Sequence, residues 1–201
     1  MGGLFGVVSN NDCVADLFFG TDYHSHLGTK RGGMCGYGRD GFNRAIHDIE
    51  NSPYRTKFEK EVDEMTGFMG IGSISDGEPQ PLTVYSRMGD YSTGTVGRIH
   101  NKEDLVKELL SNGCSQFMSM SSGGINNTEL VAALISTKST LVDGIRYAQD
   151  KIEGSATMLV MRIATGTSAI VNPEEGPEGR RGRLRPGAHR ARAAPPAAGR
   201  V

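Results

Sequence analysis

The sequence predicts a mixed α and β domain of the α+β class. Short β-favourable runs bounded by glycine or asparagine alternate irregularly with amphipathic stretches that begin at polar capping residues. No glycine-rich phosphate loop follows a predicted strand, and no Gly-x-Ser-x-Gly elbow is present, so the regular α/β classes are not indicated. With 201 residues, 37% of them apolar, the chain is long enough for one sizeable core.

The first third of the chain is predicted to hold two strands and one helix. Residues 3–9 form a β-favourable run that ends at two asparagines. An apolar stripe then predicts a helix that starts at Asp12 and stops at Gly20. A second strand is expected at residues 34–37, inside the glycine-rich segment 28–41.

The middle of the chain is predicted to be mainly β. Residues 58–65 are charged and mildly helical. Residues 69–74 and 82–85 are expected to be strands, separated by a turn at residues 76–79, and residues 95–99 form a further candidate strand.

The second half is predicted to contain three helices and a closing strand. Asn101 is expected to cap the first helix and Asn127 or Thr128 the second, while Gly154 ends the third. The predicted ranges are 101–112, 127–136 and 141–153 for the helices and 157–163 for the strand.

Charge and hydropathy exclude several kinds of partner. The formal net charge of -1 indicates neither nucleic acid nor an anionic membrane. The longest apolar stretches, such as residues 130–135 and 156–161, are far shorter than the ~20 residues that span a bilayer. Residues 1–6 lack the features of a secretory signal, so a cytoplasmic protein is expected.

The metal-ligating residue types are few and scattered. Cys13, Cys35 and Cys114 lie far apart in no metal-ligand spacing, and their odd number suits a reducing compartment. His24 and His26 form a close pair, but a zinc site needs two more ligands nearby. Neither a metal nor a cofactor is therefore expected.

The composition changes abruptly near residue 170. Residues 172–201 contain seven arginines and no lysine, with many Ala, Pro and Gly residues, so they cannot bury enough apolar surface to offset their ordering entropy. We expect a domain at residues 1–165 and a tail at 166–201, which is either disordered or not the native continuation of the domain.

Four collinear motifs resemble a known family. They are Gly-Leu-Phe-Gly-Val at 3–7, His-Leu-Gly-Thr-Lys-Arg-Gly-Gly at 26–33, the glycine-rich run at 70–75 with Gly-Glu-Pro-Gln-Pro-Leu at 77–82, and Asn-Thr-Glu-Leu-Val at 127–131. In order and spacing they resemble the class II glutamine amidotransferase domain at the N-terminus of amidophosphoribosyltransferases, which begin purine synthesis. The resemblance covers roughly residues 2–161, and it implies a four-layer αββα sandwich of antiparallel sheets like that of N-terminal-nucleophile hydrolases.

The resemblance also implies which groups the chemistry needs. An N-terminal cysteine attacks the glutamine amide, its α-amine acts as the base, and an oxyanion hole holds the intermediate. Gly2 occupies the nucleophile position in this sequence, so no catalytic residue is assigned. Losing such a nucleophile costs on the order of a million-fold in rate, and losing one oxyanion donor about a hundred- to a thousand-fold.

The substrate-binding positions implied by the resemblance have changed as well. Ser75 stands where an arginine would clamp the substrate carboxylate, and Ser73 stands where a histidine would precede it. Val96 replaces the oxyanion asparagine beside Gly97, and Asn127 beside Thr128 replaces an aspartate that would hold the substrate ammonium. Arg31 could bind an anionic ligand or could be an ordinary surface arginine; the relict site is therefore expected at Arg31, Ser75, Gly97, Asn127 and Thr128.

Three functional hypotheses follow. The first is a degenerate amidotransferase domain without glutaminase activity, and without the phosphoribosyltransferase portion that would bind phosphoribosyl pyrophosphate and Mg²⁺. The second is an active glutaminase that uses a non-standard cysteine. The third is a non-catalytic scaffold or regulatory module that binds glutamine, another small amino acid or a nucleotide in the relict pocket, with a second copy or a transferase domain as a possible partner.

Overall fold

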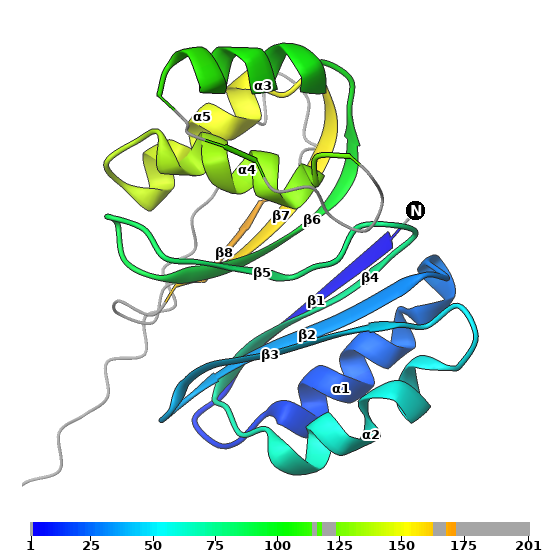
Figure 1. Ribbon diagram of the computed structural model, residues 1–201. Coiled ribbons are helices and arrows are strands. Elements are labelled where there is room, and N and C mark those ends of the chain that lie inside the picture. Colours follow the sequence, from blue (N-terminus) through cyan, green and yellow to red (C-terminus); the bar gives the residue numbers. More distant parts are fainter. Residues whose placement is uncertain (1, 114–115, 118–123, 163–167, 172–201) are drawn as a thin grey trace, which may run out of the picture.

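The computed structural model describes residues 2–113, 116–117, 124–162 and 168–171, which form two antiparallel sheets and five α-helices (Figure 1). Each sheet has four strands. Sheet A, in the order β1-β4-β2-β3, comprises β1 (Gly2–Val8), β4 (Met69–Ser75), β2 (Arg31–Gly38) and β3 (Gly41–Asp48). Sheet B, in the order β5-β6-β7-β8, comprises β5 (Leu82–Val84), β6 (Tyr91–Ile99), β7 (Gly154–Arg162) and β8 (Ser168–Val171).

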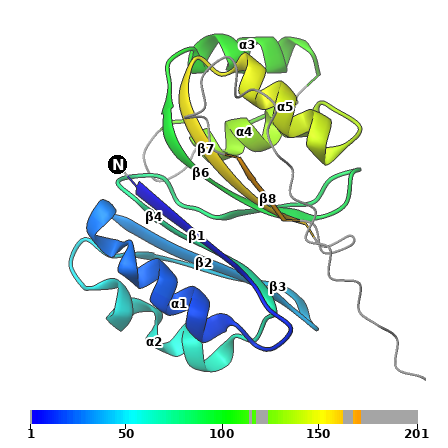
Figure 2. The same ribbon diagram turned by 180° about the vertical axis from the view of Figure 1, so that it is seen from behind.

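The helices form two groups, one on each sheet (Figures 1 and 2). The pair on sheet A comprises α1 (Val14–Tyr23) and α2 (Tyr54–Glu64), and a short 3₁₀ helix η1 (Ser25–Leu27) follows α1. The group on sheet B comprises α3 (Lys102–Ser111), α4 (Asn127–Ser136) and α5 (Leu141–Lys151).

Glycines on sheet A let α1 approach its strands closely. A Cβ atom at Gly72 would lie 1.7 Å from the Thr21 hydroxyl oxygen, and one at Gly70 would lie 2.5 Å from the Leu17 side chain. The glycine-rich sequence of β4 is therefore a packing requirement, because the helix fills the space that side chains would take.

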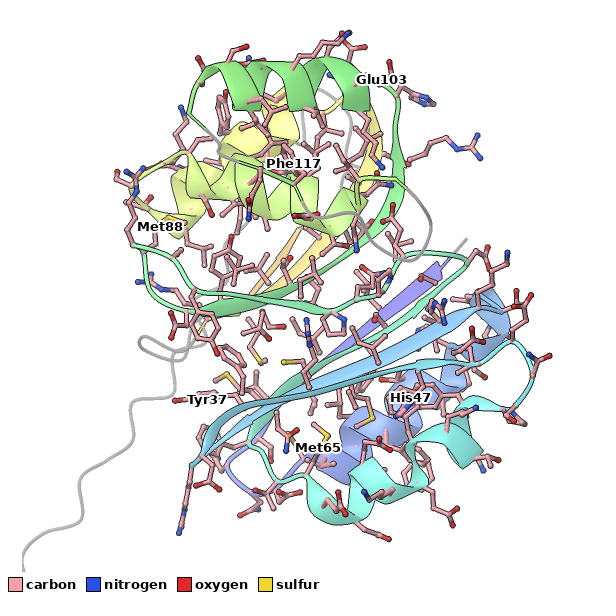
Figure 3. All side chains as sticks on the ribbon, viewed as in Figure 1. Tyr37, His47, Met65, Met88, Glu103 and Phe117 are labelled. Carbon is pink, nitrogen blue, oxygen red and sulfur yellow. The ribbon has the colours of Figure 1, made fainter. Side chains whose placement is uncertain are left out.

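The apolar core is divided among the layers. The largest cluster joins β6 and β7 to the three helices of sheet B, and a second joins α1 and α2 to sheet A. A third lies where the two sheets face each other and includes Cys35, Ile71, Leu159 and Met161. On the helix side of sheet A, the His47 ring lies between β3 and α2 with Nε2 2.6 Å from a Glu61 carboxylate oxygen (Figure 3).

Most of the predicted elements are present, and the differences have local causes. α1 does not stop at Gly20 but continues to Tyr23. Gly20 lets the helix pack against the Phe5 ring, because a Cβ atom at position 20 would lie 2.3 Å from that ring. β3, which was not predicted, follows a tight turn at Gly41, whose φ is 94°. β8, which was not predicted either, pairs with β7 as far as Val171.

Two predicted caps are also different. α4 is capped by Asn126 rather than by Asn127 or Thr128, since the Asn126 side chain accepts the N–H of Thr128. Asn101 precedes α3, but its side chain donates to the Lys151 carbonyl and accepts from the Glu153 N–H. It therefore joins α3 to the end of α5 instead of capping its own helix.

One buried amide connects both sheets to α4. Gln80 is only 2% exposed, and its side-chain oxygen accepts hydrogen bonds from the Thr95 N–H at 2.8 Å and the Thr128 hydroxyl at 2.7 Å. Its main-chain carbonyl accepts from the Ser73 hydroxyl at 2.7 Å. A Cβ at Gly33 would lie 1.8 Å from that carbonyl, so β2 also depends on the position of Gln80.

We expect Gln80→Met to lower the free energy of unfolding by about 2–4 kcal/mol, because it leaves the buried Thr95 N–H and Thr128 hydroxyl without their acceptor at nearly unchanged volume. Urea denaturation followed by circular dichroism measures the change. Gln149→Met is the control, because Gln149 is a half-buried glutamine on α5. We expect it to change the free energy of unfolding by less than about 0.5 kcal/mol. Equal effects of the two substitutions would show that the Gln80 bonds do not hold the sheets together.

Candidate functional site

Strand pairing brings three of the predicted positions into one row. Gly2 lies opposite Ser75 across the β1–β4 pair, and Ser75 lies opposite Arg31 across the β4–β2 pair. Val96 of sheet B faces this row, because its Cγ2 atom would lie 3.2 Å from a Cβ at Gly2. The Gly2 end of this row therefore lies between the two sheets, at the start of β1.

Position 2 has no room for a side chain. A Cβ atom there would lie 2.6 Å from the Ile74 carbonyl oxygen, a distance that requires the backbone of β4 to shift. The residue at the expected nucleophile position thus lacks a sulfur atom and also lies in a space that fits glycine alone.

The Ser75 and Arg31 side chains bond to the protein itself. The Ser75 hydroxyl donates to the Glu78 carbonyl at 2.6 Å. The Arg31 guanidinium donates to the Asp48 carboxylate at 2.6 Å, and the Glu50 N–H together with Arg31 holds the pKa of Asp48 below its usual value. Arg31 thus forms an intramolecular ion pair on the rim of sheet A.

The start of α4 carries the remaining polar groups. Thr128 is fully buried and bonds to Gln80, while the main-chain N–H of Asn127 donates to the Glu78 carboxylate. Among the residues that the structure describes, the buried Asn127 side-chain oxygen has no hydrogen-bond partner. Lys102 lies 3.8 Å from the Glu78 carboxylate, and burial raises the pKa of Glu78.

Glu78 is a half-buried charged residue beside this row that sequence reasoning did not single out as a site residue. It occupies the turn between β4 and β5, at the positive end of the α4 dipole. In the sequence, Glu78 was only one residue of the motif at 77–82. Its distance along the chain from Asn127 did not indicate that this turn contacts the start of α4.

Gly97 is explained by the backbone geometry of β6 and β7. Its φ is 149°, and a Cβ atom there would lie 1.9 Å from the Ser155 carbonyl oxygen of β7. Glycine is therefore required for β6 and β7 to pair at this point.

The cysteines described by the structure lie away from the row. Cys13 is 1% exposed at the start of α1, and burial followed by the charge of Asp12 raises the pKa of its thiol. Cys35 is fully buried between the sheets, 3.8 Å from the Thr83 hydroxyl, and burial raises its pKa as well. A raised pKa reduces the thiolate fraction that nucleophilic attack needs. Cys114 lies outside the described residues.

The histidine pair bonds to helix carbonyls. His24 Nδ1 lies 2.8 Å from the Gly20 carbonyl, and His26 Nδ1 lies 2.9 Å from the Tyr23 carbonyl. Within residues 2–113, 116–117, 124–162 and 168–171, no three His, Cys, Asp or Glu side chains come together as a metal site. Over the same residues, no helix has the length and apolar character to cross a membrane.

No protein-family model and no curated protein matches the chain, but solved structures do, and two of them are enzymes whose descriptions name purine biosynthesis or phosphoribosylpyrophosphate amidotransferase. One is described as the allosteric regulatory enzyme of purine biosynthesis; it has a TM-score of 0.68 and 20% identity, and the match covers 80% of this chain and 35% of that chain. Another is glutamine phosphoribosylpyrophosphate amidotransferase from B. subtilis complexed with ADP and GMP, with a TM-score of 0.70, 20% identity, and coverage of 85% and 37%. The chain is thus similar in fold to about a third of each amidotransferase, as the sequence resemblance predicted.

We expect Gly2→Ala to lower the free energy of unfolding by about 1–3 kcal/mol, since the added methyl group forces β1 away from β4. Gly77→Ala is the matched control, because a Cβ there meets nothing within 4 Å. Urea midpoints of the two variants provide the measurement. If they agree, position 2 is not sterically closed.

The raised pKa of Glu78 predicts a pH-dependent stability. The folded state holds the Glu78 proton more tightly than the unfolded state, whose pKa is near 4.5, so this group's contribution to stability is lost as pH rises through the folded pKa. Glu78→Gln has no carboxyl group to titrate at this position, so the variant does not lose this stability. The free energy of unfolding of the variant minus that of the parent should therefore increase from about pH 4 to about pH 7.

Denaturation midpoints across that range test the prediction. Glu103→Gln, on the exposed side of α3, serves as the control (Figure 3). A difference between Glu78→Gln and the parent that stays constant with pH would contradict the assignment.

Proposed function

We propose that this chain is a degenerate glutamine amidotransferase domain of an amidophosphoribosyltransferase-like protein, and that it acts as a structural module without glutaminase activity. The observation that carries the proposal is Gly2, which has neither a sulfur atom nor space for a side chain. The two solved structures support the association with purine nucleotide synthesis.

The chemistry of the fold makes this position decisive. We infer that the domain is a four-layer αββα sandwich of the N-terminal-nucleophile type, in which a cysteine thiolate must lie beside its own α-amine. Glycine offers the amine alone. The expected loss, on the order of a million-fold, leaves hydrolysis negligible.

The bonding of the surrounding groups favours a structural role over ligand binding. Ser75 bonds to the Glu78 carbonyl, Arg31 to Asp48, and the Glu78 carboxylate to the Asn127 N–H. Groups that would hold the two charged ends of an amino acid are thus bonded within the protein. Binding glutamine would first require breaking these contacts.

A second candidate is a sensor of a small amino acid. The buried Asn127 side-chain oxygen favours it, because this oxygen has no hydrogen-bond partner within the described part of the chain. An ammonium group there could donate to both the amide and the carboxylate of Glu78, which contacts the Asn127 N–H. Thermal-shift measurements with glutamine and other small amino acids test this candidate, since a ligand that binds only the folded state raises the melting temperature.

The partners and location follow from the same proposal. The chain should not make phosphoribosylamine by itself, and it would act in the cytoplasm beside a transferase domain or a second copy of itself. We propose no role in binding nucleic acid, a membrane, a metal or a cofactor.

We expect no glutamine-dependent ammonia release from this chain, and none from Gly2→Cys. The variant regains sulfur, but its Cβ collides with the Ile74 carbonyl, and Ser75 and Val96 still replace the substrate clamp and the oxyanion donor. Ammonia measured by a coupled enzymatic assay provides the test. Activity of the parent chain that disappears on changing Cys13, Cys35 or Cys114 to serine would show an alternative nucleophile instead.

A further inference from the structure

The outer face of α1 carries two large aromatic side chains that no described residue covers. α1 lies on the side of sheet A that faces away from sheet B (Figure 2). Phe19 is 57% exposed and Tyr23, one helical turn later, is 76% exposed. Asp12 and Asp16 continue the same exposed row toward the start of the helix. A helix that covers a sheet with one face normally presents polar residues on the other, so the two rings indicate a contact surface.

The helix layer that contains this face is acidic. Residues 12–23 and 54–64, which include α1 and α2, contain seven acidic and three basic residues, a formal charge of -4. The three α-helices on sheet B contain six acidic and four basic residues, a formal charge of -2. The layer on sheet A therefore favours a basic partner, whereas the same face of a second copy would be repelled.

Arg55 of α2 shows how this surface holds an arginine side chain. Its guanidinium lies 5.8 Å from the centre of the Phe19 ring, and its Nε donates to the Asp22 carboxylate at 2.6 Å. A planar guanidinium can stack on a ring and donate to a carboxylate at once, which an ammonium group does less well. Tyr23 and Asp16 offer the same two kinds of group on the exposed side of α1.

An arginine-rich segment of the same chain has the matching chemistry. Residues 180–192 contain six arginines and no acidic residue, a formal charge of +6 with His neutral. This segment lies outside the described residues, the last of which is Val171 at the end of β8. Arg180 follows nine positions after Val171. Nine residues of chain span at most roughly 30 Å.

The packing of the layers places Val171 within that reach of α1. Val171 pairs with Met158 of β7, and a Cβ at Gly6 of β1 would lie 3.0 Å from the next residue of β7, Leu159. α1 covers the other face of β1 (Figure 2). Packed sheets lie about 10 Å apart and a helix is about 10 Å across, so the outer face of α1 is roughly 25 Å from β8.

We propose that residues 180–192 bind the outer face of α1 in their own chain, with arginines stacked on Phe19 and Tyr23 and paired with the carboxylates around them. Single surface ion pairs contribute little, so the contact depends on several pairs together. It also depends on the tether, which keeps the segment at an effective concentration on the order of mM. Because salt screens exposed charges, the segment covers the rings at low ionic strength and leaves them at high ionic strength.

Limited trypsin digestion of the 201-residue chain tests the proposal, since trypsin cleaves after arginine. A small amount of isotope-labelled peptide of residues 172–201, added to the same reaction, gives the cleavage rate of the free segment by mass spectrometry. We expect the segment in the chain to be cleaved about fivefold more slowly than the peptide in ~0.02 M salt, and at the same rate in ~1 M salt. Equal rates at low salt overturn the proposal.

Matched tyrosine variants locate the apolar part of the contact. Tyr23→Ser should raise the cleavage rate of the segment about threefold, because it removes a ring on which arginine stacks. Tyr85→Ser is the control, since Tyr85 is 77% exposed but follows β5 of sheet B, and it should leave the rate unchanged. Equal effects of the two substitutions overturn the assignment to α1.

Matched charge variants locate the polar part. Asp16→Asn with Asp63→Asn removes two exposed carboxylates from the layer on sheet A and should raise the cleavage rate about fivefold. Glu103→Gln with Asp150→Asn removes two from the helices on sheet B and should not change it. Equal effects overturn the proposal in favour of a general attraction to the acidic domain. Protection that grows with protein concentration, with a dimer in sedimentation, overturns it in favour of the segment of a second copy.

Discussion

The buried amide of Gln80 is the interaction on which this arrangement of layers depends. Its side chain accepts from β6 and α4, and its main chain accepts from β4, so one residue in a connecting turn holds three elements at fixed distances. A buried polar group is tolerated only where its bonds are made, and these bonds specify a single way for the sheets to face each other. The row formed by Gly2, Ser75 and Arg31 takes its position relative to sheet B from this contact.

Much of this fold could be predicted from local patterns. β4 and α4 agree closely with their predicted ranges, because their apolar residues recur with clear period and their ends carry turn or capping residues. β3 could not be predicted, since its sequence mixes charged and apolar residues and its strand character comes from pairing with β2. The end of α1 was misplaced for a related reason: Gly20 is a packing glycine, and a single sequence does not distinguish it from a helix stop.

In the candidate site too, the positions of some residues could be predicted, but the contacts between residues distant in the chain could not. The sequence resemblance placed Gly2 and Ser75 in one site, and strand pairing indeed sets them opposite each other. The sequence contained no signal that Arg31 would pair with Asp48 across β2 and β3, or that Glu78 would fold back to α4. Both depend on contacts between residues distant in the chain. Around Gly2, the polar groups Arg31, Ser75 and Glu78 thus bond within the protein.

Asn101 imposes a constraint of a different kind on the other half of the molecule. Its side chain donates to the Lys151 carbonyl and accepts from the Glu153 N–H, so it uses both ends of an amide at once. Aspartate could only accept, lysine could only donate, and leucine could do neither. The entry to α3 and the exit from α5 are therefore joined by a connection that only a short carboxamide completes, and substitutions at this position would disturb both helices together.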